Sequence, residues 1–407
     1  MRYFLVFLFI ILMVSDTMGY TMSYVPGFSV KNLILYILFI LIVLRLKNVK
    51  LPSNIIPVNI YFIILILIAI ISWMVSSAIV AGVNYDSYRS FLVLKILIDQ
   101  YLFFFVFLFA LTDKDDILWC IKAITCIVII GNIITIIDVF NIPDLGIIHE
   151  RPDGRVSGPL GEANQYAAFM VFFIPTLIGM TIVSKGITKL FYLSGILISV
   201  LVWILTVSRG SMVGIAFGIF IGIIILKDYV NIKSIVKILL FIVPFLILIA
   251  PFTLYRYFDL IYSRIVVGTG QAEDLVSMSA GRTLIWSRAL EKLYDSPGNI
   301  FIGMGWNTFK QYFPYAAHNI YLNYIFELGI IGLVLILIVF YKLFNITYNS
   351  LSYAGEFEKI ILVSFLFGYL ALLFSVFFVD LYQPWVFIWS FIGLMTRLAL
   401  EISSEHN

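Results

Sequence analysis

The fold is decided by residues 281–340, which read GRTLIWSRALEKLYDSPGNIFIGMGWNTFKQYFPYAAHNIYLNYIFELGIIGLVLILIVF. A polar segment with two arginines and a Gly-x-Gly passes through Ala-His-Asn directly into a long apolar run. An apolar run of about 20 residues is long enough to cross the hydrocarbon of a bilayer as a helix. We therefore expect His318 to lie where a water-exposed loop meets the membrane, with arginines on the same side.

The composition extends this interpretation to the whole chain. Of the 407 residues, 62% are hydrophobic and only 12% are charged, and the mean hydropathy is +1.07. These values exclude a soluble globular protein and predict an all-α polytopic membrane protein that forms one integral membrane unit over residues 1–407. Twelve apolar runs predict transmembrane helices, at 3–15, 31–45, 58–81, 91–111, 117–138, 165–184, 189–207, 211–226, 234–254, 319–343, 358–379 and 384–400. We expect the first to be a retained span rather than a cleaved signal peptide, because no convincing small-residue cleavage site follows it.

The distribution of basic residues orients the bundle. With the N-terminus in the cytoplasm, 14 of the 26 Lys and Arg residues fall on the cytoplasmic side and four fall in short outer loops. Eight of the 12 basic residues on the outer side are arginines, whose planar fork suits phosphate oxygens. Most polar sequence lies in two outer loops, 139–164 and 255–318, so we expect the working face to be periplasmic.

The first outer loop joins arginines to a polar cluster at the start of a span. Arg151 and Arg155 precede Gly158-Pro-Leu-Gly161, whose glycines allow tight turns and close approach to a ligand. Glu162 and Asn164 follow at the beginning of the predicted helix. They suit either helix capping or contact with a sugar or phosphate.

Three further arginines are candidates for binding an anion. Arg209 lies in Ser208-Arg209-Gly210-Ser211 between two apolar runs, which predicts a position at the outer membrane boundary. It suits either a lipid pyrophosphate or snorkelling to headgroups. Arg282 and Arg288 lie on a segment whose apolar spacing predicts an amphipathic helix on the membrane surface.

His318 is the candidate general base. An imidazole titrates near neutrality and can take a proton from a hydroxyl, although a histidine at a helix start can also be a cap or a headgroup contact. His149, in the first outer loop, is a second candidate. Glu327 falls eight residues into the next span, about 12 Å deep at the helical rise. It is expected either to hold Arg209 or His318 or to pack against a neighbouring helix.

Two other pairs of residues have simpler interpretations. Lys95 and Asp99 lie four apart on one predicted span, where they can neutralise each other. Cys120 and Cys126 lie six apart on one helix and point in different directions, so neither a disulfide nor a metal site follows.

Taken together, these motifs resemble the core of bacterial O-antigen ligases and polymerases. The resemblance rests on Arg282-x-x-x-Trp286, Gly303-x-Gly305, Ala317-His318-Asn319, Tyr321-Leu322 and Glu327-Leu-Gly329-Ile-Ile-Gly332. The Ser208-Arg209-Gly210 element and the Gly-Pro-Leu-Gly loop fit the same family. The resemblance covers roughly residues 150–345, and the predicted twelve-span layout extends it to the whole chain.

This resemblance implies a GT-C-like membrane glycosyltransferase that is inverting, independent of a metal and without a cofactor. The implied donor is an undecaprenyl-pyrophosphate-linked oligosaccharide, used on the periplasmic face of the bacterial inner membrane. By the same resemblance, Arg209 and Arg282 hold the donor pyrophosphate and His318 activates the acceptor hydroxyl. The residues expected to assist in substrate binding are Arg151, Arg155, Glu162, Asn164, Arg288, Asn319 and Glu327.

Several alternatives stay open at this stage. A polymerase transfers the glycan to another lipid-linked repeat unit, whereas a ligase transfers it to lipid A–core or to a protein; the 37 Phe and 24 Tyr favour the polymerase. A flippase for the same lipids is disfavoured because the sequence shows neither internal repeats nor broken helices. A non-catalytic scaffold would leave the polar outer residues without a role. Besides the substrates, the expected partners are membrane lipids and a chain-length regulator, not nucleic acid.

Overall fold

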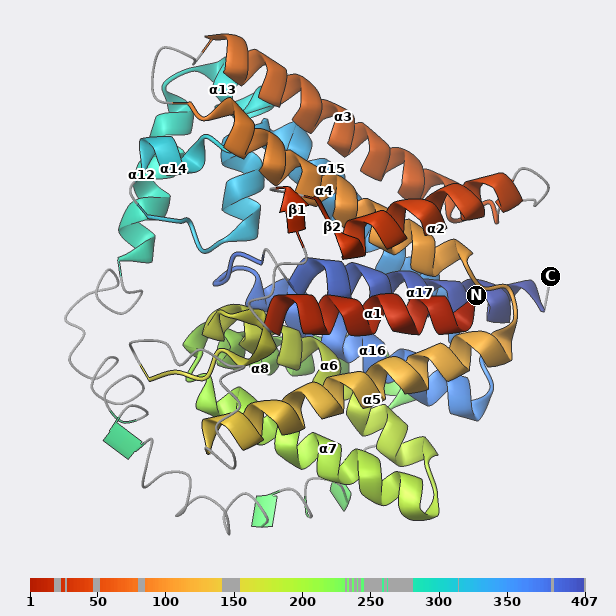
Figure 1. The fold of residues 1–407 in the computed structure, drawn as a ribbon. Helices are drawn as coiled ribbons and strands as arrows, with labels where there is room; N and C mark the ends of the chain where they lie inside the picture. The colour runs from red at the N-terminus through yellow and green to blue at the C-terminus, as the bar shows by residue number, and fades with distance from the viewer. Residues whose placement is uncertain are drawn as a thin grey trace.

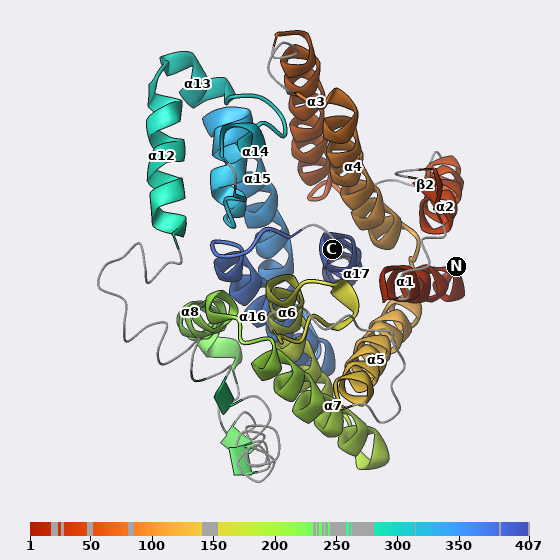
Figure 2. The same ribbon diagram turned by 60° about the vertical axis from the view of Figure 1, so that its left-hand side comes forward.

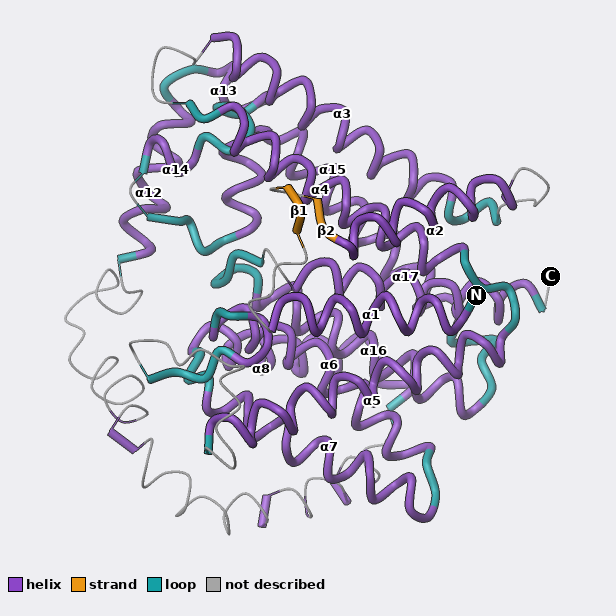
Figure 3. The backbone as a smooth tube through the Cα atoms, viewed as in Figure 1, coloured by secondary structure: helices purple, strands orange, loops and turns teal. Residues whose placement is uncertain are grey.

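The computed structural model describes residues 1–17, 23–25, 28–46, 52–79, 85–140, 154–230, 281–313, 315–381 and 384–405, with isolated residues between 233 and 262. Within these ranges the chain is a bundle of helices, and its strands are β1 (Ser23–Val25) and β2 (Phe28–Ser29), which pair antiparallel (Figure 3). The predicted all-α polytopic fold is confirmed.

Nine of the described helices are long and apolar enough to cross a membrane. They are α3 (Ile56–Ile79), α4 (Ser87–Phe109), α5 (Lys114–Val139), α6 (Ala163–Val183), α7 (Gly186–Leu205), α8 (Arg209–Leu226), α15 (Ile320–Ser350), α16 (Glu356–Ser375) and α17 (Pro384–Ser404). Two shorter helices, α1 (Arg2–Thr17) and α2 (Val30–Leu46), lie where the first two spans are predicted. The predicted span 234–254 lies almost entirely outside the described residues, so the count of twelve stays a prediction.

Capping residues decide where some of these helices begin. The Asp86 carboxylate accepts the backbone N–H of Arg89 at 2.9 Å, so α4 begins at Ser87 rather than at the predicted residue 91. Asp113 caps α5 in the same way, through the N–H of Asp116. Hydropathy detects only the apolar part of a helix, and the polar first turn is therefore missed.

The two ends of the bundle differ in what they carry (Figure 1). Both chain termini lie at one end, which we call the inner end. The opposite, outer end carries the first residues of α6, α8 and α15 together with three short helices of the large loop. These are α12 (Arg282–Tyr294), α13 (Pro297–Ile302) and α14 (Phe309–Tyr312). Figure 2 shows the same short helices gathered beside α15.

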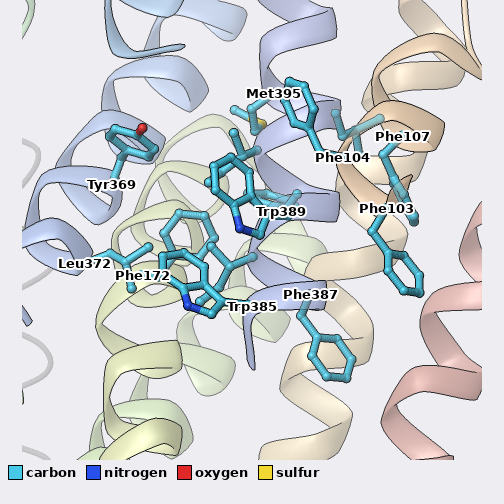
Figure 4. Close-up of a cluster of buried hydrophobic side chains, with 14 of the residues drawn as sticks. Phe103, Phe104, Phe107, Phe172, Tyr369, Leu372, Trp385, Phe387, Trp389 and Met395 are labelled. Atoms are coloured by element: carbon cyan, nitrogen blue, oxygen red, sulfur yellow. The ribbon is translucent and has the colours of Figure 1, made fainter. Parts of the chain in front are cut away.

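The interior of the bundle is built on α6 and α17. In their most apolar windows, 78% and 83% of the residues are buried, against 28% for α3 and α8, which lie at the periphery of the described bundle. Trp389 of α17 is fully packed at the centre of this core, with ring centroids 5.0 Å from Phe62 and 5.8 Å from Phe104 (Figure 4). Because α17 is central, the turn between α16 and α17 emerges at the middle of the outer end.

Glycines bring α8 unusually close to α16. A Cβ added at Gly214 or Gly218 would overlap the backbone of Ser375 or Ala371. Small residues at this four-residue spacing let two helix backbones approach within a membrane. The close packing places Arg209, the first residue of α8, beside the segment that follows α16.

Candidate active site

Arg209 is delivered to the outer end by a very short turn between α7 and α8. Val207 has a positive φ of 48°, and the Ser211 hydroxyl donates a hydrogen bond to the Ser208 carbonyl at 2.8 Å. A Cβ on Gly210 would overlap the side chain of Phe378, so this turn packs directly on the segment after α16. The predicted position of Arg209 at the outer end is therefore where the structure has it.

Helix α12 carries Arg282 and Trp286 four residues apart, and both hold segments of the site. The Arg282 guanidinium donates through Nη1 to the Phe378 carbonyl at 2.9 Å. The Trp286 indole donates through Nε1 to the Ala317 carbonyl at 2.7 Å, immediately before His318. The Arg-x-x-x-Trp motif thus joins the turn after α16 to the start of α15.

One face of α12 packs against protein, and the predicted contact of this helix with the membrane surface stays a prediction. Ala289 and Leu293 are buried in a cluster with Phe309 and Phe326, and Leu284 is exposed. The amphipathic pattern predicts the helix, and its buried residues pack against Phe309 and Phe326, which lie 16 or more residues further along the chain.

His318 is held by a carboxylate that the sequence analysis did not single out. Its backbone N–H donates to Oδ2 of Asp380 at 2.8 Å, and the Asn323 side-chain amide donates to Oδ1 at 2.8 Å. The imidazole Nδ1 lies 3.8 Å from the same Oδ2. His318 has a positive φ of 49°, a strained conformation for a non-glycine residue that these contacts stabilise.

Burial and charge set the protonation of this pair. Burial lowers the pKa of His318 below its ordinary value; Asp380 opposes this shift, and the positive charge of Arg282 adds to it. The imidazole is therefore neutral at neutral pH and able to accept a proton. Burial raises the pKa of Asp380, and His318, Lys310 and Arg282 pull it back down.

The two arginines share one electrostatic environment with this pair. Burial lowers the pKa of Arg282, the negative charge of Asp380 raises it, and the positive charge of Arg209 lowers it. A guanidinium stays protonated at neutral pH despite such a shift. The structure therefore brings Arg282 and His318 to Asp380 and places Arg209 within electrostatic reach of Arg282, and we call these four residues the outer cluster.

Arg155 binds its own chain. The side chain is only 4% exposed, and its Nε donates to the Thr206 carbonyl at 2.7 Å. Its Nη2 donates to Oδ1 of Asn164, also at 2.7 Å. Arg155 thereby ties the first outer loop to the end of α7. Arg151 and His149 lie outside the described residues.

Glu162 caps α6 and also faces the outer cluster. Its carboxylate accepts the N–H of Gln165 at 2.7 Å and the Asn164 amide at 3.1 Å. Its negative charge raises the pKa of both Arg282 and His318. Capping is therefore observed for Glu162, and a contact from Glu162 to sugar stays a prediction.

Helix α15 is broken at Gly329, a break that the sequence alone did not reveal. Gly329 has φ 66° and ψ −170°, and a Cβ there would overlap the carbonyl of Phe301. Beside the break, the Phe326 and Glu327 carbonyls accept backbone N–H groups of Met304 and Gly305 at 2.7 and 3.1 Å. The loop carrying Gly303-x-Gly305 thus supplies hydrogen bonds to α15 at the break.

The Glu327 carboxylate holds this loop. It accepts the N–H of Asn307 at 2.9 Å and that of Phe309 at 3.4 Å. Asn307 in turn donates to the hydroxyl of Ser90 at 3.1 Å, in the first turn of α4. Glu327 therefore holds the loop 303–309 beside the first turn of α4, and its expected depth of about 12 Å stays a prediction.

Two other predicted site residues, Asn319 and Arg288, are a helix cap and an exposed side chain. Asn319 is the N-cap of α15 and accepts the N–H of Leu322 at 3.1 Å. Arg288 is exposed on α12, and within the described part of the chain no hydrogen bond or ion pair joins it to the outer cluster. Substrate contacts by either residue stay predictions.

Asp380 is the residue that the sequence analysis missed. It stands between the apolar runs 358–379 and 384–400, in a turn too short to be noticed as a loop. An acidic residue within such a turn at the arginine-rich end was the available signal.

Among the described residues, no three His, Cys, Asp or Glu side chains gather so as to hold a metal ion. The predicted independence of a metal is not tested by this.

Fold and site together define a class: a polytopic all-α membrane protein whose outer end gathers two arginines, a neutral histidine and a buried carboxylate. A family model described as O-Antigen ligase matches residues 194–337, about a third of the chain. Over these residues the chain is similar to an O-antigen ligase-like family, which confirms the resemblance and supports a ligase or polymerase type of function. The match includes Arg209, Arg282 and His318 and ends before Asp380. No curated protein sequence matches the chain.

Proposed function

We propose that the protein is a membrane glycosyltransferase that moves an oligosaccharide from undecaprenyl pyrophosphate to a sugar hydroxyl. The observation that carries this proposal is the convergence of Arg282 and His318 on the buried carboxylate of Asp380, with Arg209 within electrostatic reach of Arg282. The reaction would take place at the outer end of the bundle. With the orientation favoured by the basic residues, that end faces the periplasm from the bacterial inner membrane.

The donor would bind through its pyrophosphate. One N–H of Arg282 is taken by the Phe378 carbonyl, and its other guanidinium N–H groups have no hydrogen-bond partner among the described residues. Arg209 adds a second positive charge nearby. Two partly buried cations beside a site where phosphate charge develops would stabilise the leaving group in the transition state.

The acceptor hydroxyl would be activated by His318. The neutral imidazole takes the hydroxyl proton while the oxygen forms a bond to the anomeric carbon. The bond from that carbon to the pyrophosphate oxygen breaks on the opposite face, so the configuration inverts and undecaprenyl pyrophosphate leaves. Asp380 holds the His318 backbone and favours the imidazolium that forms. No metal is assigned a role in this mechanism.

We favour a polymerase, in which the acceptor is another lipid-linked repeat unit and a chain-length regulator is a partner. The aromatic richness of the chain supports this choice. The second candidate is a ligase that transfers the glycan to lipid A–core or to a protein, and the description of the matching family favours it. Both candidates use the same donor chemistry.

Transport of the same lipids is the proposal's rival from another class. The break in α15 is a feature that transporters also show, usually near the middle of the membrane. Here the break in α15 lies level with the outer end of α4. The loop 303–309 donates backbone hydrogen bonds to the α15 carbonyls beside the break. That position supports a fixed outer site better than alternating access.

The test is reconstitution of the purified protein with lipid-linked repeat units alone, followed by a gel for glycan length. A ladder that disappears in His318→Ala and persists in Lys292→Ala supports the polymerase. Transfer that begins only when lipid A–core is added supports the ligase. If neither assay shows glycan transfer and the lipid-linked sugar crosses vesicle bilayers, the proposal is overturned in favour of transport.

A further inference from the structure

A cavity of about 280 Å³ opens at the inner end of the bundle, far from the outer cluster. It lies where α3 begins and where α15 and α17 end. Among the described residues its polar lining consists of Ser53, Asn54, Lys342, Asn345, Asn349 and Ser403. The proposed transferase chemistry uses none of these side chains.

The charge in this cavity is positive and unbalanced. Lys342 is the charged residue of the lining, and no carboxylate lies among the lining residues that the structure describes. Its ammonium group lies 5.7 Å from the ring centroid of Tyr61, a contact that leaves its N–H groups able to bind an anion. Lys342, Asn345 and Asn349 recur on one face of α15, so their donors converge on the same space.

Apolar surface continues from the cavity toward the middle of the bundle. On α3, Pro57 lines the cavity, and Ile60 and Leu67 follow at helical spacing with exposed fractions of 48% and 51%. On α15, Tyr341 lines the cavity and Leu337 follows one turn away, 42% exposed. A polar pocket with a positive charge, continued by two exposed apolar rows, matches a molecule with an anionic head and hydrocarbon chains.

We propose that this cavity binds the headgroup of an anionic phospholipid from the leaflet at the inner end, with the acyl chains lying along α3 and α15. The phosphate oxygens would accept hydrogen bonds from Lys342 and from the side-chain amides of Asn345 and Asn349. The inner end is the one that the basic residues assign to the cytoplasm, where anionic lipids attract such cationic sites.

The test measures lipid binding to the purified full-length protein in detergent by native mass spectrometry. Phosphatidylglycerol is titrated against phosphatidylcholine, and inorganic phosphate is added in a separate arm. We expect tighter binding of phosphatidylglycerol. Lys342→Gln should weaken it about fivefold, since one lysine near a membrane surface contributes about that much. Asn349→Asp, which adds a negative charge and keeps the lysine, should weaken it as well.

The matched control is Lys359→Gln, a lysine near the start of α16 at the same end that does not line the cavity. It should change phosphatidylglycerol binding less than twofold. Equal binding of the two lipids would overturn the proposal, and so would equal effects of Lys342→Gln and Lys359→Gln. Displacement of the lipid by millimolar inorganic phosphate would assign the cavity to a soluble phosphate instead. A thermal unfolding scan of each variant without added lipid separates loss of binding from loss of fold.

Discussion

The carboxylate of Asp380 accepts the backbone N–H of His318 at 2.8 Å, although the two residues lie 62 positions apart in the chain. The other oxygen of the same carboxylate accepts the Asn323 amide, so Asp380 joins the turn after α16 to both the approach and the first turn of α15. The histidine has a positive φ, which an L-residue adopts only at a cost in free energy. Asp380 therefore sets the position of His318 as well as its charge.

The pH dependence of transfer tests this relationship. Burial lowers the pKa of His318 and Asp380 opposes that shift. Because the neutral imidazole is the proposed base, kcat/KM should be level at neutral pH and fall only below the ordinary histidine pKa of about 6.5. Asp380→Asn removes the opposing charge, so the pKa of His318 should fall further and the acidic limb should move to lower pH. The amide oxygen can still accept the His318 N–H.

The control for this experiment is Glu162→Gln, because the Glu162 charge also raises the pKa of His318, although less than Asp380 does. Its acidic limb should move in the same direction by a smaller amount. An acidic limb that stays in place in Asp380→Asn, or moves to higher pH, contradicts the assignment of His318 as the base.

Arginine at position 282 should not be replaceable by lysine. Its guanidinium binds the Phe378 carbonyl through one nitrogen and keeps others for phosphate, whereas a lysine ammonium is a single point charge. We expect Arg282→Ala to lower kcat/KM by about 100-fold or more, in line with the loss of one oxyanion-stabilising donor, and Arg282→Lys to restore only a small part. Lys292→Gln, on the same helix but paired with Asp295 and 42% exposed, should behave as the wild type. An Arg282→Lys rate equal to that of the wild type would show that the Arg282 guanidinium does not bind the donor.

Trp286 should act through the loop that carries His318. Its indole N–H donates to the Ala317 carbonyl at 2.7 Å, and phenylalanine would keep the ring in place without the hydrogen bond. The net worth of such a bond is about 1 kcal/mol, so Trp286→Phe should lower kcat about fivefold with little change in the melting temperature. A matched Trp203→Phe removes a comparable indole bond, to Ser211 in the turn that delivers Arg209. That variant should change donor KM rather than the pH profile.

The break in α15 should depend on glycine. Gly329→Ala places a Cβ onto the Phe301 carbonyl at a positive φ, so both overlap and strain oppose it. We expect a loss of stability of at least about 2 kcal/mol, measured as a lower melting temperature in detergent. Gly281→Ala has a positive φ and open space, and its cost should be nearer the strain alone, about 1 kcal/mol. Gly298→Ala has neither problem and should be neutral. Equal melting temperatures for all three would mean that the close contact between Phe301 of α13 and Gly329 of α15 does not form.

Much of the fold could be predicted from the sequence, because hydropathy is a local property. The runs that become α3 through α8 were placed within a few residues. The polar first turns of α4 and α5 were missed because a capping aspartate adds no hydrophobicity. The break at Gly329 was also missed, since its cause is the backbone of Phe301 in a different segment.

For the candidate site, the sequence by itself determined which residue types stand at the outer end: Arg209 and His318 each follow from a motif beside a membrane-spanning run, and Arg282 follows from a motif in the large outer loop. Only the tertiary structure decided which residues contact one another. The Arg155 guanidinium binds a carbonyl at the end of α7, and the buried side of α12 packs against protein. Asp380 accepts the backbone N–H of His318. The physical reason is that transfer from water to lipid acts on each segment alone, whereas hydrogen bonds and charge act between groups that only folding brings within a few ångströms of each other.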